Sequence, residues 1–147
     1  MSTATAVIVS AHLLATVAMG GLIWFVQVVH YPLFAAVGDN RFVAYEHDHT
    51  RRTAWVVGPF MAVEGVTALV LLGSPIEGVR LLAFVGAALL AAVHASTVLL
   101  QVPAHRRLSS EADPTVMRRL VATNWIRTVG WSARSVVAMA IVLEAAS

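Results

Sequence analysis

Hydrophobic positions gather into four long runs, separated by short polar connections, over residues 6–29, 53–73, 79–102 and 115–144. Each run holds about 20 or more mostly apolar residues, which lets an α-helix cross a hydrocarbon core of roughly 30 Å. The spacing between the runs leaves no room for a separate soluble domain. The pattern predicts an all-α protein, an integral membrane up-and-down four-helix bundle that forms a single domain over residues 1–147.

Turn-forming residues mark where the predicted helices end and begin. Pro32 ends the first run, and the charged stretch 41–52 is expected to form an interfacial helix leading into the second span. Pro103 is expected to stop the third helix, which leaves residues 104–113 as a polar loop. Asp113-Pro114 combines an N-cap residue with a first-turn proline and predicts the start of the last helix.

The composition agrees with lipid as the main partner. The chain is 59% hydrophobic and 12% charged, with a mean hydropathy of +0.78, which is too apolar for an ordinary soluble domain. It has no cysteine, and this excludes disulfides and thiolate ligands. A scattered net charge of +2 indicates no nucleic-acid partner.

The arginines predict the orientation in the membrane. Basic residues near span ends favour the cytoplasmic side. Only Arg80 stands beside the second connection, whereas the first and third connections are flanked by Arg41, Arg51, Arg52, Arg106, Arg107, Arg118 and Arg119. We therefore expect a protein of a bacterial-type inner membrane, with both termini outside and the connections 1–2 and 3–4 in the cytoplasm.

If the four spans alternate in direction across the membrane, most polar side chains lie in the cytoplasmic half of the bundle, and His12 lies near the other end. The outer half is then expected to be almost purely hydrocarbon. Polar side chains in lipid face the bundle interior or a water-filled cavity, so the sequence predicts a polar pocket. Its members would be Gln27, His30, Tyr31, Tyr45, His47, His49, Glu64, His94, Gln101, His105, Asn124, Arg127 and Arg134.

Buried charges in this set need partners. An isolated carboxylate such as Glu64 costs roughly 2.5–3.5 kcal/mol on insertion scales. Arg134 lies about 30 Å into the last helix, too deep for its side chain to reach the interface. We therefore expect Glu64 and Arg134 to pair.

The histidines differ in what their spacing predicts. His47 and His49 point in divergent directions on a helix, so only one can face inward. His49 is expected to do so, while His47 is solvated. His94 is either a hydrogen-bonded core residue or part of the site, and His105 is explained equally well by a lipid-headgroup contact or by a site.

The segment Val102-Pro103-Ala104-His105-Arg106-Arg107-Leu108 and the later Asn124-Trp125-Ile126-Arg127 together resemble motifs of the anthrone oxygenase-like family of small four-span membrane proteins. Pro32 matches a proline that follows the first helix in that family. His105 stands where an asparagine is usual, and Glu64 has no counterpart role. The resemblance implies oxygenation of an aromatic, lipid-soluble compound without a standard cofactor.

The first functional hypothesis is accordingly an oxidoreductase or oxygenase acting on a hydrophobic small molecule that enters from the bilayer. A histidine, His94 or His30, would be the general base, and Glu64 would orient either this base or Arg127. Arg127 and Asn124 would stabilise a developing oxyanion. The substrate-binding residues would be Asn124, Arg127, Arg134 and Gln101.

Two other classes of function stay open. The bundle could hold haem or a transition metal, with candidate ligands His30, His49, His94 and Glu64, although no His-x-x-x-His spacing occurs. It could instead be a non-enzymatic subunit of a larger membrane complex or a small transporter, and a homo-oligomer suits either role.

Overall fold

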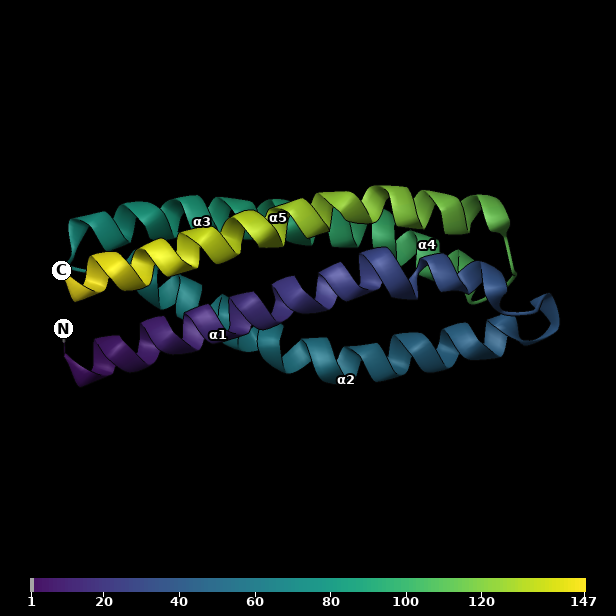
Figure 1. Cartoon of the computed structure of the whole chain (residues 1–147), viewed down its shortest axis with the longest axis horizontal. Helices are drawn as coiled ribbons and strands as arrows, with labels where there is room; N and C mark the ends of the chain where they lie inside the picture. The colour runs from purple at the N-terminus through teal and green to yellow at the C-terminus, as the bar shows by residue number, and fades with distance from the viewer. Residues whose placement is uncertain (1) are drawn as a thin grey trace.

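The computed structural model describes residues 2–147 and confirms the all-α bundle. Four helical stretches are long and apolar enough to cross a membrane: Thr3–Ala36, Asp39–Leu72, Glu77–Leu108 and Pro114–Ala146. They run up and down, and both termini lie at one end (Figure 1). We call this the terminal end. The opposite end, with the connections around residues 37–38 and 109–113, is the loop end.

The first stretch changes its helical winding before it reaches the loop end. Helix α1 (Thr3–Phe25) passes into a π-turn (η1, Val26–His30) and then into a 3-10 turn (η2, Pro32–Ala36). Pro32 has no N–H to donate to an α-helix, so the regular winding ends before it as predicted. The wider π-turn re-aims His30 toward the second helix.

The second stretch is one uninterrupted helix. Helix α2 (Asp39–Leu72) joins the charged segment 41–52 and the apolar run 53–73 into a rod that passes through Pro59. Its 34 residues extend about 51 Å, longer than a hydrocarbon core of roughly 30 Å. Its first turns can therefore reach the interface.

The third stretch corrects one expectation. Pro103 does not stop the helix: α3 (Glu77–Ser96) continues through a π-turn (η3, Thr97–Gln101) into α4 (Val102–Leu108). Pro103 is accommodated because it sits in the first turn of α4, directly after the π-turn, where a missing N–H is tolerated. The first half of the predicted loop 104–113 is thus helical, and His105 is held on a helix.

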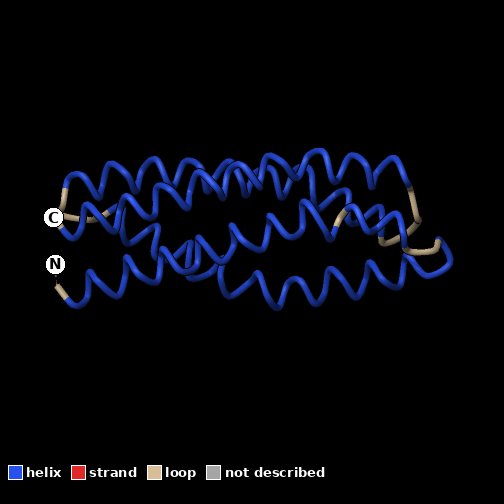
Figure 2. The backbone as a smooth tube through the Cα atoms, viewed as in Figure 1, coloured by secondary structure: helices blue, strands red, loops and turns tan. Residues whose placement is uncertain are grey.

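The last helix begins as predicted. Helix α5 (Pro114–Ala146) is capped by Asp113, whose carboxylate accepts from the backbone N–H groups of Thr115 and Val116 at 2.8 and 3.2 Å. The bond from Val116 is the main reason that the pKa of Asp113 lies below its usual range. Helix α5 packs against both α1 and α3. Figure 2 shows the loops at the two ends of the bundle, apart from a short break inside it, which corresponds to the turn at Tyr31 between η1 and η2.

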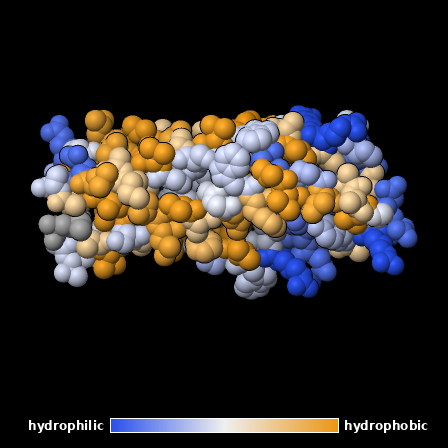
Figure 3. Space-filling view, in the orientation of Figure 1, coloured by the Kyte–Doolittle hydropathy of each residue, from blue (hydrophilic) through white to orange (hydrophobic). Residues whose placement is uncertain are grey.

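The outer surface is apolar over most of its length. Figure 3 shows hydrophobic residues from the terminal end to the middle of the visible face, with hydrophilic residues gathered at the loop end. Exposed side chains include Leu14, Leu69 and Val136. Such a surface is compatible with lipid contact around the helices.

Candidate functional site

One buried polar contact is the predicted ion pair. Arg134 Nε donates to Glu64 Oε1 at 2.9 Å, and the indole N–H of Trp131 donates to Glu64 Oε2 at 3.2 Å. Arg134 also donates to the carbonyl of Gly86 on α3. Glu64 and Arg134 are almost fully buried, so this pair joins α2, α3 and α5 inside the bundle.

This ion pair does not lie where the sequence placed it. Because α2 is continuous from Asp39 to Leu72, Glu64 is about 12 Å from the terminal end of that helix. His12 lies in the same half, where its Nδ1 is 2.8 Å from Thr67 Oγ1. The expectation that these polar side chains share one pocket in the other half, and that the terminal half is almost purely hydrocarbon apart from His12, is therefore wrong.

A second polar cluster occupies the loop end. His105 Nδ1 on α4 lies 2.5 Å from Glu46 Oε1 on α2. The other ring nitrogen of His105, Nε2, is 2.9 Å from the hydroxyl of Tyr31. Glu46 is 0% exposed and Tyr31 4%, whereas the His105 side chain between them is 16% exposed.

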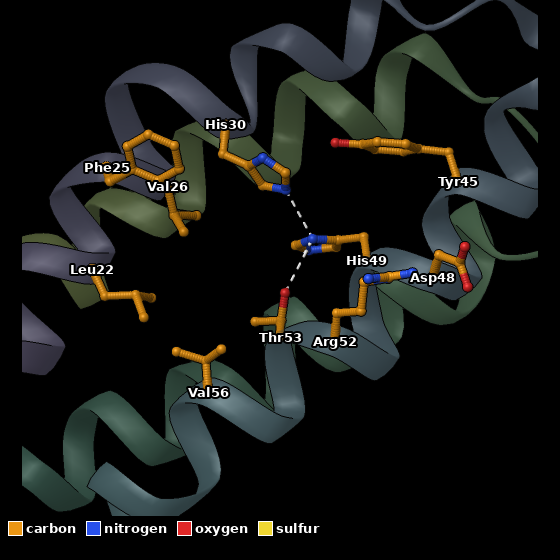
Figure 4. A pocket seen from close by; sticks show the side chains of 10 residues that line it. All are labelled: Leu22, Phe25, Val26, His30, Tyr45, Asp48, His49, Arg52, Thr53 and Val56. Carbon is orange, nitrogen blue, oxygen red and sulfur yellow. Dashed lines mark hydrogen bonds between the residues drawn. The ribbon is translucent and has the colours of Figure 1, made fainter.

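Two further histidines adjoin this cluster. His30 Nε2 and His49 Nδ1 are 2.8 Å apart, and His49 Nδ1 is also 3.1 Å from Thr53 Oγ1 (Figure 4). His30 comes from the π-turn and His49 from α2, so the pair bridges the first two helices. His49 faces inward and His47 is exposed, as predicted.

The cluster contains a set of atoms suited to a metal ion. Glu46, His49 and His105 each offer one donor atom, and these three atoms lie within 4.8 Å of one another. Glu46 Oε2 is buried and has no hydrogen-bond partner among residues 2–147. Burying a carboxylate oxygen without a partner is costly, so this atom stands out from the otherwise bonded cluster.

Two cavities meet at His49. The larger, of about 480 Å³, lies between α1 and α2 and has mostly apolar walls that include Phe25, Val26 and Val56 (Figure 4). Its polar side is formed by His30 and His49 together with Tyr45, Asp48, Arg52 and Thr53. The other cavity, of about 380 Å³, reaches from His49 to α4 and α5. Its polar lining includes Tyr31, Thr97, Gln101, His105 and Arg127.

The predicted binding residues of α5 divide into two kinds. Asn124 is fully buried and donates to Gln27 Oε1 at 2.9 Å, while its own oxygen accepts from Arg127 Nη1 at 3.2 Å. Asn124 therefore holds η1 and Arg127 in place, and it lines neither of these cavities. Arg127 lines the smaller cavity, and its buried Nε has no partner in the described chain.

Gln101 also lines the smaller cavity, and its Nε2 donates to Thr123 at 3.1 Å. Arg134 stays with Glu64 at the other end of the bundle.

His94 makes no hydrogen bond to either polar group in the described chain, although its ring centroid lies 6.5 Å from that of Trp131, which donates to Glu64. It is half-buried and lines an apolar groove between α2 and α3 with residues such as Ala68, Leu69 and Leu90. Its Nδ1 has no partner within residues 2–147. The structure therefore brings His30 and His49 together, but places His94 and Glu64 elsewhere.

Sequence reasoning missed Glu46 and left the role of His105 undecided. A helical stripe contained the sign of Glu46: Phe42, Glu46, His49 and Thr53 are spaced by four, three and four positions along one face. The charges around Glu46 made the segment look solvated. For His105, the expected helix end at Pro103 hid its position on α4.

The donor set suits a single ion better than haem. Two histidines holding a haem iron need about 4 Å between their nitrogens, twice an ordinary metal–nitrogen bond, and a slot for the macrocycle. His30 and His49 are in direct hydrogen-bond contact at 2.8 Å. No protein-family model, curated protein or solved structure matches the chain.

Proposed function

We propose that the protein is a membrane-embedded oxidoreductase of the oxygenase type, acting on a hydrophobic aromatic small molecule at the loop-end cluster. The observation that carries the proposal is the 480 Å³ apolar cavity with the His30–His49 pair on its polar side. A large apolar pocket with a few converging polar groups is the usual form of a small-molecule site.

The position of the larger cavity supports entry from the bilayer. Phe25 and Val56, on its two walls, are 57% and 51% exposed on the apolar outer surface. A lipid-soluble molecule could therefore pass between α1 and α2 without crossing water. An aromatic compound of a few fused rings matches both the volume and the apolar walls.

The His30–His49 pair supplies the proton acceptor. Histidine titrates near neutrality, and a base must lie within hydrogen-bond reach of the proton that it removes. The sequence offered His30 or His94 as the base. We assign this role to His30, because His30 lines this cavity and His94 does not.

Arg127 supplies positive charge on the far side of the cluster. It lines the adjoining cavity with Tyr31 and His105, and Asn124 fixes its position. Such a fixed cation would stabilise an oxyanion of a phenolic substrate that reaches from the larger cavity past His49 into this one. Asn124 thus acts as a positioning residue for Arg127.

The reaction that the family resemblance implies balances with dioxygen as the oxidant. A ring CH₂ group and O₂ give a ring C=O and water: two C–H bonds break, one oxygen atom forms the carbonyl, and the other leaves with both hydrogens. The carbon loses four electrons, which O₂ accepts. The protein's part is to remove the first proton, stabilise the anion and exclude water.

The loop end, and with it the cluster, is proposed to lie on the cytoplasmic side. Seven arginines flank the loop-end connections, and Arg80 is the single arginine beside the connection at the terminal end. The positive-inside rule places the arginine-rich side in the cytoplasm.

Oxygen uptake by proteoliposomes supplied with a hydroxyanthrone tests the proposal. We expect substrate-dependent consumption of one O₂ per carbonyl formed, and a loss of about 100-fold or more in His30→Ala, in the range of general-base catalysis. His47→Ala is the matched control, because His47 is exposed on the same end of the bundle. Uptake that persists in His30→Ala, or that is absent from the wild type with a panel of such compounds, would overturn the proposal.

A further inference from the structure

We propose that Glu46, His49 and His105 form a binding site for one divalent transition-metal ion at the loop end of the bundle. The site goes beyond the proposed oxygenation, for which the family resemblance implies no standard cofactor. The proposal rests on the positions of three residues, and it does not depend on the oxygenation being correct.

The donor atoms are already close to a coordination geometry. They lie within 4.8 Å of one another, whereas ligands bound at about 2.0–2.2 Å stand roughly 3–4 Å apart. A shift of about an ångström in the side chains closes the difference. The three residues come from α2 and α4, which the π-turn η3 and the long α2 hold side by side.

The unpartnered oxygen is the second, independent observation. Glu46 is 0% exposed, and its Oε2 has no hydrogen-bond partner anywhere in residues 2–147. A buried carboxylate normally has its oxygens satisfied by hydrogen bonds, an ion pair or a metal. An ion bound beside Glu46 would satisfy this oxygen, and the nearby histidines would complete its ligands.

The neighbours of the three ligands match what metal sites have around them. Metal-bound histidines usually bond their second ring nitrogen to another polar group. His105 does so through Nε2, 2.9 Å from the Tyr31 hydroxyl. His49 does so through Nδ1, which contacts His30 and Thr53 and leaves Nε2 free for the ion.

The ligand types define the class of metal. Two imidazoles and one carboxylate favour Fe(II), Mn(II), Co(II) or Zn(II), whereas Ca²⁺ and Mg²⁺ prefer sites built of oxygen atoms. Three protein ligands leave coordination positions open. The cavity of about 380 Å³ beside His49 and His105 gives room for a further ligand there.

Titration of untagged, metal-free protein in detergent with Co²⁺ tests the site, because the visible spectrum of Co(II) reports its ligands. We expect one equivalent to bind, with nitrogen and oxygen ligands. Glu46→Gln and His105→Gln should each weaken binding by at least 100-fold. His47→Ala and Asp48→Asn are matched controls on the same turns of α2, since both residues are exposed, and they should bind Co²⁺ like the wild type.

Helicity and thermal unfolding, measured on every variant, keep a folding defect from being read as a lost ligand, and His49→Gln gives a third variant if one fails to fold. The proposal is overturned if folded protein binds no Co²⁺, or if folded Glu46→Gln and His105→Gln bind it as tightly as the wild type. It is also overturned if His47→Ala abolishes binding.

The result is separate from that of the oxygenation assay. Specific Co²⁺ binding without turnover of any hydroxyanthrone would reject the function alone. Turnover together with no metal binding would reject the metal site alone.

Discussion

Glu46 and His105 are 59 positions apart in the chain, yet their side-chain atoms lie 2.5 Å apart at the loop end. Two features of the helices bring them together. Helix α2 starts early enough to carry Glu46 into the bundle, and η3 lets the third helix continue past Pro103 to His105. We therefore expect chemistry at the loop end, and we propose a structural role for the ion pair in the terminal half.

The structural role of the ion pair predicts a stability effect. Removing one partner of a buried pair leaves the other charge uncompensated, which costs about 3–5 kcal/mol. We expect such a loss in Glu64→Leu and in Arg134→Met, measured by unfolding in mixed SDS micelles. The double variant should recover much of the loss, and exposed Glu144→Gln should change little. Losses below about 1 kcal/mol in both single variants would refute a structural role.

Tyr31 predicts an effect on metal affinity through His105. Its hydroxyl is 2.9 Å from His105 Nε2, and loss of such an outer hydrogen bond typically weakens metal binding by about 10–100-fold. Tyr31→Phe should weaken Co²⁺ binding by that factor. Tyr45→Phe should not, because Tyr45 lines the larger cavity and makes no hydrogen bond to the three ligands in the described structure. Equal affinities in Tyr31→Phe and the wild type would show that Tyr31 does not orient His105.

The larger cavity predicts a specific steric effect. Val56→Phe adds a ring at its wall and should raise KM for a hydroxyanthrone by about tenfold, equivalent to 1.4 kcal/mol of binding. Val63→Phe is the control, because Val63 is an exposed valine two turns further along α2 and outside this cavity. Steady-state oxygen uptake gives both constants. Identical KM values in the two variants would place the substrate elsewhere.

The cysteine-free chain allows a direct measurement of orientation. Ser110 and Ser147 are exposed at the loop end and the terminal end, so Ser110→Cys and Ser147→Cys report one side each. A membrane-impermeant maleimide added to intact cells should label Ser147→Cys and spare Ser110→Cys until the cells are opened. The reverse pattern would invert the proposed topology.

Much of the fold could be predicted from the sequence, because four apolar runs and their lengths leave few alternatives in a membrane. The pairing of Glu64 with Arg134 followed from the cost of two buried charges. Pro103 was misjudged because a π-turn, which lets the helix continue around it, leaves no clear mark in the sequence. That error hid the position of His105. Glu64 was wrongly placed beside the loop-end histidines because the second span was taken to begin at residue 53, whereas α2 begins at Asp39.

Glu46 shows a different limit. Its neighbours His47, Asp48 and Arg51 are solvated, so local composition points outward, while its helical phase with Phe42 and His49 points inward. Only the positions of α4 and η1 decide between the two, and these depend on contacts between residues distant in the chain.

An experimental structure of the protein with a bound hydroxyanthrone would locate the substrate directly. We predict density for the rings in the cavity between α1 and α2, with a polar atom of the compound within hydrogen-bond distance of His30 or His49. Density instead in the groove beside His94, or next to Glu64 and Arg134, would contradict the placement of the functional site at the loop end.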